Sequence, residues 1–574
     1  MPGLPNVPPH LRRFVVEQDY SQYTAMDQAV WRFVLLQNYA RLVETAHPAY
    51  REGLTATGLS VERIPSIAEM NERLGQFGWG AVCVDGFIPP RAFQEFQARG
   101  LLPIAADMRT LAHLVYTPAP DIIHEAAGHA PILTDPTYAA YLRRIGEIGK
   151  RAFTIPAEDR VFQAVYSLSE VKEDPSKSPE SIARVERELD AALAGVVEPS
   201  EAAWLSRLYW WTAEYGLVGT PKRYHLYGAG LLSSLWESHS CHARDVLKIP
   251  LDETCTKVSY DITRPQPQLF VAKNFEHLHE TLERVAKTLA CNIGGGVAIG
   301  RAVQSRELAS LRFSSGAWAI GILTEAGPNP FEPAWLRLEG PVAFAWDGVI
   351  LRDERATPRQ PDQWLITGPL AGGIALHGAS DNTLAGLYDA HTGRHHLLFA
   401  SGAAVEGRLS RAIRDESGRV LLLHFHDVRL TLPGRAVFDL PEYHLLATGD
   451  FITAEAGSVD ARYHSHTDYP HVRVPKPRNL PEREAALLHL YETGWANRAR
   501  EAQTELHAIL GREFPREWLL RWNLLEDALK RGDSPDLAAT LRQELETLED
   551  VHEKREPIAT GLGYLAKRFP ERQT

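Results

Sequence analysis

The sequence has few cysteines, no long apolar run and no excess of basic residues, and each shortage excludes a class of protein. Only four cysteines occur among 574 residues, and none is in CxxC spacing, which argues against a disulfide framework and a zinc knuckle. No uncharged apolar stretch approaches the roughly 18 residues needed to span a bilayer. The N-terminal segment MPGLPNVPPHLRR has prolines where a signal peptide would be apolar. We therefore expect a soluble, cytoplasmic protein without a membrane partner.

The charge balance points away from nucleic acid. The formal net charge is −12, with 61 basic and 73 acidic residues, whereas a nucleic-acid-binding surface needs a basic face. Hydrophobic residues make up 44% of the chain and charged residues 23%, which is ordinary globular composition and excludes a disordered or fibrous protein. A small-molecule substrate is therefore the expected partner.

The spacing of apolar residues divides the chain into three regions. Residues 1–291 have mostly helical spacing, as in segments 29–46 and 275–290, where apolar side chains recur every three or four positions. The glycine-rich segment 292–300 then predicts a linker. A nucleotide-binding loop is disfavoured there, because no strand precedes the glycines and the GxGxxG order is missing.

Beyond this segment, residues 303–455 show strand-like alternation broken by Gly, Pro and Asp turns, which predicts an all-β domain. Residues 478–574 return to charged amphipathic helices that would pack on a neighbouring domain or on a second copy in a homo-oligomer. The predicted fold class is thus a multidomain protein: a mainly α domain, then a β-rich domain of unknown role, then a C-terminal helical region.

The segment YTPAPDIIHEAAGHAPIL (116–133) carries the first chemical signal. Its histidines, His124 and His129, are five residues apart, whereas the HExxH motif of zinc proteases needs a spacing of four. On an ideal helix five residues rotate a side chain by about 500°, which leaves the two imidazoles about 140° apart. Both reach one metal only if the helix ends or deforms between them, and Gly128 and Pro131 favour such an end.

A third ligand is expected in LYWWTAEYGL (208–217). Glu214 lies there among aromatic residues, where a lone glutamate is unfavourable without a cationic or metal partner. Two neutral imidazoles and one carboxylate form the facial triad of non-heme Fe(II) oxygenases, which leaves positions open for dioxygen and water. The alternative interpretations are surface histidines and an ion-paired helical glutamate.

These segments resemble a known family. YTPAPDIIHEAAGHAPIL, LYWWTAEYGL and YGAGLLSS (227–234) are similar, and in the same order, to the signature segments of pterin-dependent aromatic amino acid hydroxylases, closest to the bacterial phenylalanine 4-hydroxylases. The resemblance covers about residues 20–290 and implies that residues 1–291 are a catalytic domain. It implies a monooxygenase that uses Fe(II), a tetrahydropterin and O2 to hydroxylate a free aromatic amino acid, with phenylalanine converted to tyrosine as the leading hypothesis.

The resemblance also assigns roles to individual residues. It implies that the iron is held by His124, His129 and Glu214. It implies substrate contacts from Arg109, Thr117, Pro120, Trp210, Tyr215 and Ser233. It implies pterin contacts from Gly86, Phe87, Ile88 and Phe93 in the segment GFIPPRAF (86–93), and from Glu125 and Tyr209. Asp121 would lie behind the ligands and orient a histidine. The family commonly has phenylalanine where Tyr215 stands, so the polarity of the pocket differs from the family pattern.

Several alternatives stay open. Tryptophan, tyrosine or another aromatic substrate is compatible with the motifs, and Ile262, at a position we align with a family specificity site, does not decide. A zinc-dependent hydrolase and a catalytically silent binding protein are rival classes. The sequence after residue 300 has no counterpart in the short bacterial hydroxylases, and no N-terminal stretch is long enough for the regulatory domain of animal enzymes.

Histidines outside these motifs offer a second metal hypothesis. The β-rich region contains His424 and His426 in HFH, and the segment after it contains His464 and His466. Residues i and i+2 of a strand share a face, so HxH can ligate a metal. Half-exposed strand histidines are the simpler interpretation, because the sequence identifies no third ligand.

Overall fold

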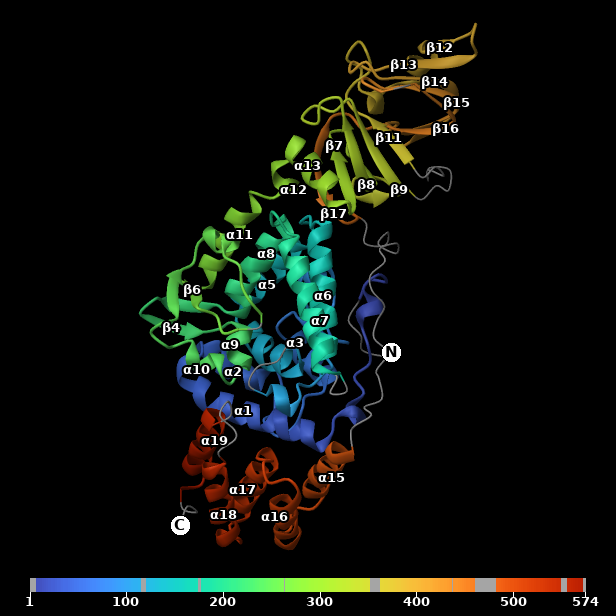
Figure 1. The fold of residues 1–574 in the computed structure, drawn as a ribbon. Helices are drawn as coiled ribbons and strands as arrows, with labels where there is room; N and C mark the ends of the chain where they lie inside the picture. Colours follow the sequence, from blue (N-terminus) through green and yellow to red (C-terminus); the bar gives the residue numbers. More distant parts are fainter. Residues whose placement is uncertain are drawn as a thin grey trace.

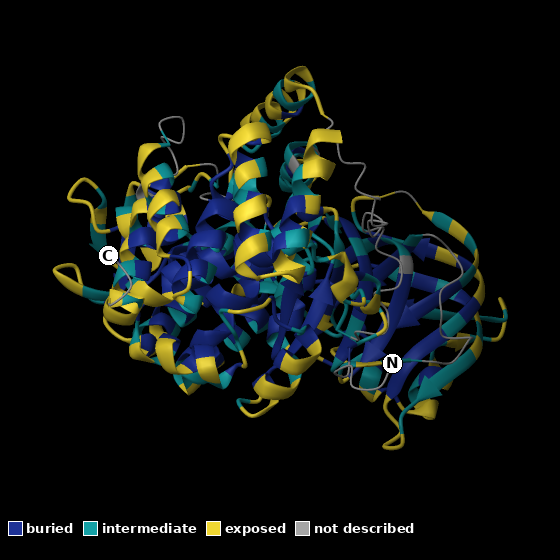
Figure 2. Ribbon diagram, turned by 90° about the horizontal axis from the view of Figure 1, so that it is seen from below, coloured by how far each residue is buried: buried dark blue, intermediate teal, exposed yellow. Residues whose placement is uncertain are grey.

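The computed structural model describes residues 7–114, 120–173, 177–262, 264–351, 362–435, 437–459, 482–548 and 555–570. A β-rich part and a group of C-terminal helices lie at opposite ends of a mainly helical N-terminal part (Figure 1). Buried residues fill the interior of the molecule, and exposed residues lie on the outer turns of the helices (Figure 2). Within the described ranges, no helix has both the length and the apolar character needed to cross a membrane.

The N-terminal part is built mainly from helices. Its α-helices are α1 (Ala25–Thr45), α2 (Pro48–Ala56), α3 (Ile67–Gly75), α4 (Pro90–Ala98), α5 (Pro136–Gly149), α6 (Pro156–Glu173), α7 (Pro179–Ala194), α8 (Glu201–Tyr209), α9 (Ala229–Ser233), α10 (Glu237–Ser240), α11 (Phe275–Ala286) and α12 (Ala290–Ile293). Two π-helical segments are η4 (Ile123–His129) and η6 (Trp210–Glu214). Short 3-10 turns are η1 (Arg12–Phe14), η2 (Tyr20–Gln22), η3 (Leu111–His113), η5 (Pro131–Thr134) and η7 (Glu253–Lys257).

Two small sheets complete this part. Strands β1 (Gly80–Val84) and β2 (Leu101–Ala105) pair in parallel. A four-stranded sheet has the order β4-β3-β6-β5. Its strands are β3 (Leu217–Thr220), β4 (Arg223–Leu226), β5 (Leu247–Pro250) and β6 (Gln268–Ala272). These strands are hard to predict from the sequence because they have only four or five residues. In addition, β1 and β2 are buried at every position, so they lack the alternation of polar and apolar residues.

Helix α1 connects two parts of the molecule. It begins with a capping box, in which Thr24 and Asp27 each accept a hydrogen bond from the other's backbone N–H. One side packs into the N-terminal part, where the Asn38 side chain donates a hydrogen bond of 2.9 Å to the carbonyl of Leu232 in α9. Its other side contacts the C-terminal helices α15, α17 and α19. This double packing explains why the buried residues of α1 are not confined to one stripe.

The predicted linker at 292–300 is wrong. Helix α13 (Gly295–Ser305) occupies most of this segment and is separated from α12 by Gly294, whose φ is +74°. Tertiary packing outweighs the low helix propensity of glycine here, because Ala298, Ile299 and Ala302 are buried in the core of the β-rich part. A Cβ atom on Gly296 would lie 2.3 Å from the ring of Phe331, so a larger residue there would displace this exposed side chain.

The β-rich part consists of two sheets around one apolar core. The first has the order β10-β9-β8-β7-β17, with β11 also paired to β9. It comprises β7 (Leu308–Phe313), β8 (Ala317–Gly327), β9 (Trp335–Trp346), β10 (Val349–Ile350), β11 (Asp362–Ile366) and β17 (Phe451–Ala456). The second, antiparallel throughout, comprises β12 (Tyr388–Asp389), β13 (Arg394–Leu398), β14 (Ala404–Arg414), β15 (Val420–Thr431) and β16 (Phe438–Leu446) in that order. A short helix, α14 (Asp381–Gly386), and the turn η8 (Leu376–Gly378) interrupt the strands, so the region is not purely β.

Polar contacts join the β-rich part to the N-terminal part. Arg151 forms an ion pair of 2.7 Å with Glu455 of β17, and Arg91 pairs with Glu307. The Thr453 hydroxyl donates to the carbonyl of Ala290 at 3.1 Å. These contacts fix how the two parts meet.

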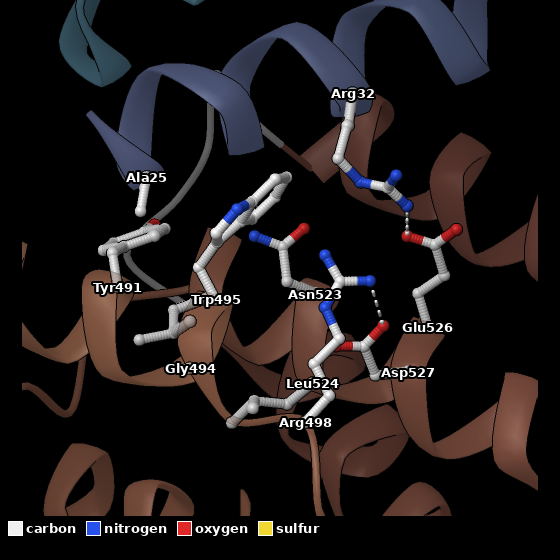
Figure 3. Close-up of a pocket in the computed structure, with 11 residues that line it drawn as sticks. Ala25, Arg32, Tyr491, Gly494, Trp495, Arg498, Asn523, Leu524, Glu526 and Asp527 are labelled. Atoms are coloured by element: carbon white, nitrogen blue, oxygen red, sulfur yellow. Dashed lines mark hydrogen bonds and ion pairs between the residues drawn. The ribbon is translucent and has the colours of Figure 1, made fainter. Parts of the chain in front are cut away.

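The C-terminal helices are α15 (Glu482–Ala496), α16 (Arg500–Glu513), α17 (Leu519–Arg531), α18 (Pro535–Thr547) and α19 (Arg555–Arg568). They meet α1 through an aromatic cluster, in which the Phe33 ring lies 4.9 Å from the ring of Trp518 and 5.0 Å from that of Trp522. Beside this cluster Arg32 forms a 2.6 Å ion pair with Glu526, which is 1% exposed (Figure 3). A buried charge of this kind is stable only while its partner is present.

We expect Trp522→Ala to destabilise the docking of the C-terminal helices by about 3–5 kcal/mol, because it deletes a fully buried indole from the α1 interface. Urea unfolding followed by circular dichroism measures the effect. Trp495→Ala is the matched control, since that indole is 38% exposed at the edge of the same interface. Equal unfolding midpoints for the two variants would contradict the role of Trp522.

Candidate metal centre

The two histidines of the HExxGH segment lie on a π-helix. Helix η4 covers Ile123–His129, and its C-cap Ala130 donates its backbone N–H to the carbonyl of Glu125, five residues earlier. Hydrogen bonding from i to i+5 widens the helix, so residues five apart approach one side. The helix therefore deforms between the histidines, as their spacing requires, but by widening rather than by ending.

Close packing against α9 accompanies the widened helix. A Cβ atom on Gly128 would lie 2.7 Å from the carbonyl oxygen of Ala229, so any larger residue would push the two elements apart. The ring centroids of His124 and His129 are 5.0 Å apart and nearly perpendicular. His129 is fully buried, whereas the side chain of His124 is 17% exposed.

Glu214 closes the cluster from a second π-helical segment. It is the last residue of η6, after which the chain turns into β3. Its two carboxylate oxygens face different histidines, with Oε2 3.2 Å from Nε2 of His124 and Oε1 3.1 Å from Nε2 of His129. The three ligand atoms lie within 4.8 Å of one another. This donor set fits one ion that prefers nitrogen and oxygen ligands and keeps open coordination positions.

The orientation of His124 is set by Ser233. The Ser233 hydroxyl donates its proton to the carbonyl of Ala229 at 2.8 Å, so its oxygen accepts a hydrogen bond from Nδ1 of His124 at 3.0 Å. In the neutral imidazole, the proton on Nδ1 leaves the lone pair on Nε2, the nitrogen on the side of Glu214. Such a partner behind a ligand histidine fixes its tautomer and ring plane.

The electrostatics of the cluster favour an ionised carboxylate. Burial alone would raise the pKa of Glu214, but His129 and His124 outweigh burial and hold this pKa well below its usual value. Burial would lower the pKa of His124, but the charge of Glu214 and their hydrogen bond raise it to about 9. Without a metal, the site therefore takes up a proton at neutral pH in place of a cation.

Arg109 and Asp121 form a buried ion pair beside this cluster. Asp121 accepts from Nε of Arg109 at 2.7 Å and from Nη2 at 2.8 Å, and both side chains are at most 3% exposed. Burial would raise the pKa of Asp121, but Arg109 lowers it. Asp121 also accepts from the backbone N–H of His124 at 3.0 Å. Its contact with the histidine is thus through the backbone, while Ser233 holds the imidazole.

An aromatic group includes the first residue of η6 and the residue that follows it. The Trp210 ring lies 4.6 Å from that of Tyr215 and stacks on Tyr260 at 4.2 Å. The Tyr215 hydroxyl donates to Glu237 at 2.7 Å. Burial raises the pKa of Glu237 to about 7, against the lowering effect of this hydrogen bond and of one from the backbone of Gln266.

The residues expected to contact pterin lie along one side of the metal cluster. The ring of Phe93, on α4, meets the edge of Tyr209 at 5.8 Å, and Tyr209 lies 6.4 Å from the ring of His129. Glu125 is 5% exposed, with Oε2 4.0 Å from Nε2 of His129, and burial raises its pKa. Gly86, Phe87 and Ile88 form the half-buried loop that precedes α4, and Gly86 has a φ of +63°.

The structure gathers most of the residues named from the sequence. Pro120 is half-buried at the start of the segment that leads into η4, and Thr117 lies outside the described residues. Three buried or partly buried residues that sequence reasoning missed contact Trp210, Tyr215 or each other: Glu237, Tyr260 and Gln266. The only sequence signal for Glu237 was its position shortly after YGAGLLSS, since nothing marks it as a partner of Tyr215.

Comparisons with known proteins identify the family of the chain. The family model of the biopterin-dependent aromatic amino acid hydroxylases matches residues 17–161 and 176–294. A phenylalanine-4-hydroxylase of Ralstonia nicotianae is 30% identical over 272 residues, which are 46% of this chain and 72% of that protein. One of Mesorhizobium japonicum is 30% identical over 276 residues, which are 47% of this chain and 83% of that protein. A crystal structure of Chromobacterium violaceum phenylalanine hydroxylase with iron(III) and 7,8-dihydrobiopterin is 25% identical, with 50% and 92% of the chains covered and a TM-score of 0.37.

The chain belongs to the biopterin-dependent aromatic amino acid hydroxylases. The predicted family, the class of enzyme, and a pterin and iron as cofactors are confirmed. The alternatives of a zinc hydrolase and of a silent binding protein are therefore dropped. The match ends at residue 294, so the two large sheets and the C-terminal helices lie outside it.

The raised pKa of Glu237 predicts a pH-dependent loss of stability. Because the pKa in the folded state lies above that of an unfolded glutamate, folding favours the protonated acid, and its stabilising contribution is lost as pH rises from about 4.5 to 7. Glutamine imitates the protonated acid and does not titrate. Between pH 5 and pH 8 we expect wild type to lose up to about 3 kcal/mol relative to Glu237→Gln, measured as a difference in thermal midpoints.

Tyr215→Phe is the matched variant, because it removes a hydrogen bond that lowers the pKa of Glu237. The stability of Tyr215→Phe should therefore continue to fall at a higher pH than the stability of wild type. Parallel stability curves for wild type and Glu237→Gln across this pH range would show that Glu237 does not titrate there.

Proposed function

We propose that this enzyme hydroxylates the ring of free L-phenylalanine to give L-tyrosine, with His124, His129 and Glu214 as the ligands of Fe(II). The observation that carries the proposal is the convergence of two imidazole Nε2 atoms and one carboxylate within 4.8 Å. Three protein ligands on one side of a ferrous ion leave the other positions for dioxygen and water. When bound, iron and the tetrahydropterin supply the activation of dioxygen.

The protein's own contribution is to bind the substrate and to fix its orientation. Asp121 holds the edge of the Arg109 guanidinium that carries Nε and Nη2, and Nη1 donates to the carbonyl of Ser233 at 3.4 Å. The second N–H of Nη1 would bind the carboxylate of the amino acid. Thr117 and Ser233 would add hydroxyl contacts around the same carboxylate. Because Asp121 also holds the backbone of His124, the anchor of the substrate and the first metal ligand are fixed to each other.

The aromatic ring of the substrate would lie between Pro120, Trp210 and Tyr215. The Tyr215 hydroxyl is occupied by Glu237, so this residue presents mainly its ring to the pocket. The pocket is therefore less polar than the sequence alone suggests, which favours phenylalanine. The relatives named above are phenylalanine-4-hydroxylases, which supports the same substrate.

The pterin would lie against Phe93, with the loop Gly86, Phe87 and Ile88 along its edge and Tyr209 between it and His129. The buried carboxyl group of Glu125 points toward the metal side, with Oε2 4.0 Å from Nε2 of His129. A pterin ring bears N–H groups, and such a carboxyl group can accept hydrogen bonds from them. Closing this space to water before both substrates are present would limit wasteful oxidation of the pterin.

Turnover tests the proposal directly. Protein reconstituted with Fe(II) and supplied with tetrahydropterin and O2 should hydroxylate phenylalanine faster than tyrosine or tryptophan, with product identified by chromatography. Glu214→Gln should lower kcat by more than about 100-fold, because it removes the anionic ligand while keeping the side-chain shape. Glu72→Gln, on the exposed side of α3, is the matched control and should leave turnover unchanged. Preferred hydroxylation of tryptophan or tyrosine would refute phenylalanine as substrate.

Metal binding should depend on pH. Ligation needs a neutral imidazole, whereas His124 in the metal-free site has a pKa of about 9. Each Co²⁺ bound below that pH should therefore release a proton, and its affinity should fall by about tenfold for each pH unit between 8.5 and 6.5. Calorimetric titration with Co²⁺ measures this slope. His129→Ala, which lacks one proposed ligand, distinguishes this site from other binding, and a pH-independent affinity would contradict the coupling.

A further inference from the structure

A second cluster of metal-ligating side chains lies on the β-rich part, outside the family match. His424 and His426 are two residues apart on β15, and Glu442 and His444 are two residues apart on β16. The antiparallel register pairs His424 with His444 and His426 with Glu442. Residues i and i+2 share a face of a strand, and directly opposed residues share a face of a sheet. All four side chains therefore lie together on one face of this sheet.

The intervening residues point the other way. Phe425 and Tyr443, paired with each other between these positions, are buried in the apolar core shared by the two sheets. The cluster consequently lies on the outer face, where His426 is exposed and where His424 and Glu442 are half-buried. His426 therefore gives the cluster a solvent-exposed member on this face.

The distances are close to those of a metal site. The ligand atoms of His424, His426 and Glu442 lie within 4.8 Å of one another, and Nε2 of His424 is 3.5 Å from Oε2 of Glu442. Bonds of about 2.1 Å in a tetrahedral site place ligand atoms about 3.4 Å apart. Closing the remaining gap requires rotation of the His426 side chain, which is exposed. The buried His444 ring stacks on that of His424 at 4.4 Å and fixes its plane.

Ser410 gives His424 the tautomer that a metal requires. Its hydroxyl donates to the backbone carbonyl of His424 at 3.0 Å, so its oxygen accepts from Nδ1 of the same histidine at 3.2 Å. Nε2, the nitrogen on the side of Glu442, then carries the lone pair. The same arrangement occurs in the N-terminal part, where Ser233 donates to a backbone carbonyl and accepts from Nδ1 of His124. A register shift in β14 between Leu409 and Arg411 brings Ser410 to this position.

We propose that His424, His426 and Glu442 bind a divalent transition-metal ion of the zinc type. Two imidazoles and one carboxylate suit such an ion, whereas Ca²⁺ and Mg²⁺ prefer oxygen ligands. Arg408 and Arg411 lie opposite these histidines on β14, and Arg408 is paired with Asp427 at 3.6 Å. The carboxylate of Glu442 supplies the negative charge that a cation needs beside them. A bound ion holds β16, the edge strand of this sheet, to β15.

The experiment is Zn²⁺ binding by the full chain, measured by competition with a chromophoric chelator. His129→Ala serves as the parent, because it disables the proposed iron centre and isolates the second cluster. The parent should bind one Zn²⁺ tightly, and adding His426→Ala should weaken this binding by more than tenfold. His489→Ala, which removes an exposed histidine on α15, is the matched control and should leave the affinity unchanged.

Two further variants make the test specific. Glu442→Gln keeps the shape of the side chain and should weaken Zn²⁺ binding as much as His426→Ala does. Agreement between the two variants shows that the loss of binding does not come from misfolding of one of them. Ser410→Ala should weaken it by about 10- to 100-fold, although Ser410 is not a ligand, because the tautomer of His424 is no longer fixed. Binding that survives both His426→Ala and Glu442→Gln, or a parent that binds no Zn²⁺, overturns the proposal. The result does not depend on hydroxylase activity, so it is separable from a failure of the proposed function.

Discussion

The catalytic part depends on a carboxylate held in the interior between two imidazoles. An isolated charge at the position of Glu214 would be strongly unfavourable, and it is stable only because His124 and His129 face it from another segment of the chain. Both segments are π-helical, and the close approach of Gly128 to Ala229 is needed to bring η4 against α9. Local backbone geometry, packing and charge therefore all favour the same placement of Glu214 between the two histidines.

The ion pair between Arg109 and Asp121 extends this arrangement toward the proposed substrate site. Asp121 is bound to the guanidinium and also to the backbone at the start of η4. Ser233 is held on the opposite side, where its carbonyl lies 3.4 Å from Nη1 of Arg109 and its hydroxyl orients His124. The guanidinium proposed to bind the amino acid carboxylate and the proposed metal ligand His124 are thus connected through three side chains.

Much of the site could be predicted from the sequence because its residues lie in short, contiguous motifs. The five-residue spacing of His124 and His129 already required a deformed helix, and aromatic neighbours marked Glu214 as unusual. Glu237 could not be found in this way, because its partner Tyr215 is 22 residues away and the contact depends on tertiary packing. Helix α13 was missed for a related reason, since burial against the sheets outweighs the local preference of glycine. The third member of the cluster around His424 required the register of β16.

The attachment of the C-terminal helices has a consequence for relatives of this protein. The aromatic contact of Phe33 and the buried pair of Arg32 with Glu526 occupy one side of α1, while Asn38 on the same helix holds the backbone beside Ser233. A chain without such an extension would expose this side of α1 to water, and polar residues would then suit it better. In relatives, the polarity of the residues aligned with Arg32 and Phe33 should consequently vary with the presence of the extension. Helix α1 is therefore a marker of whether a hydroxylase domain carries such an extension.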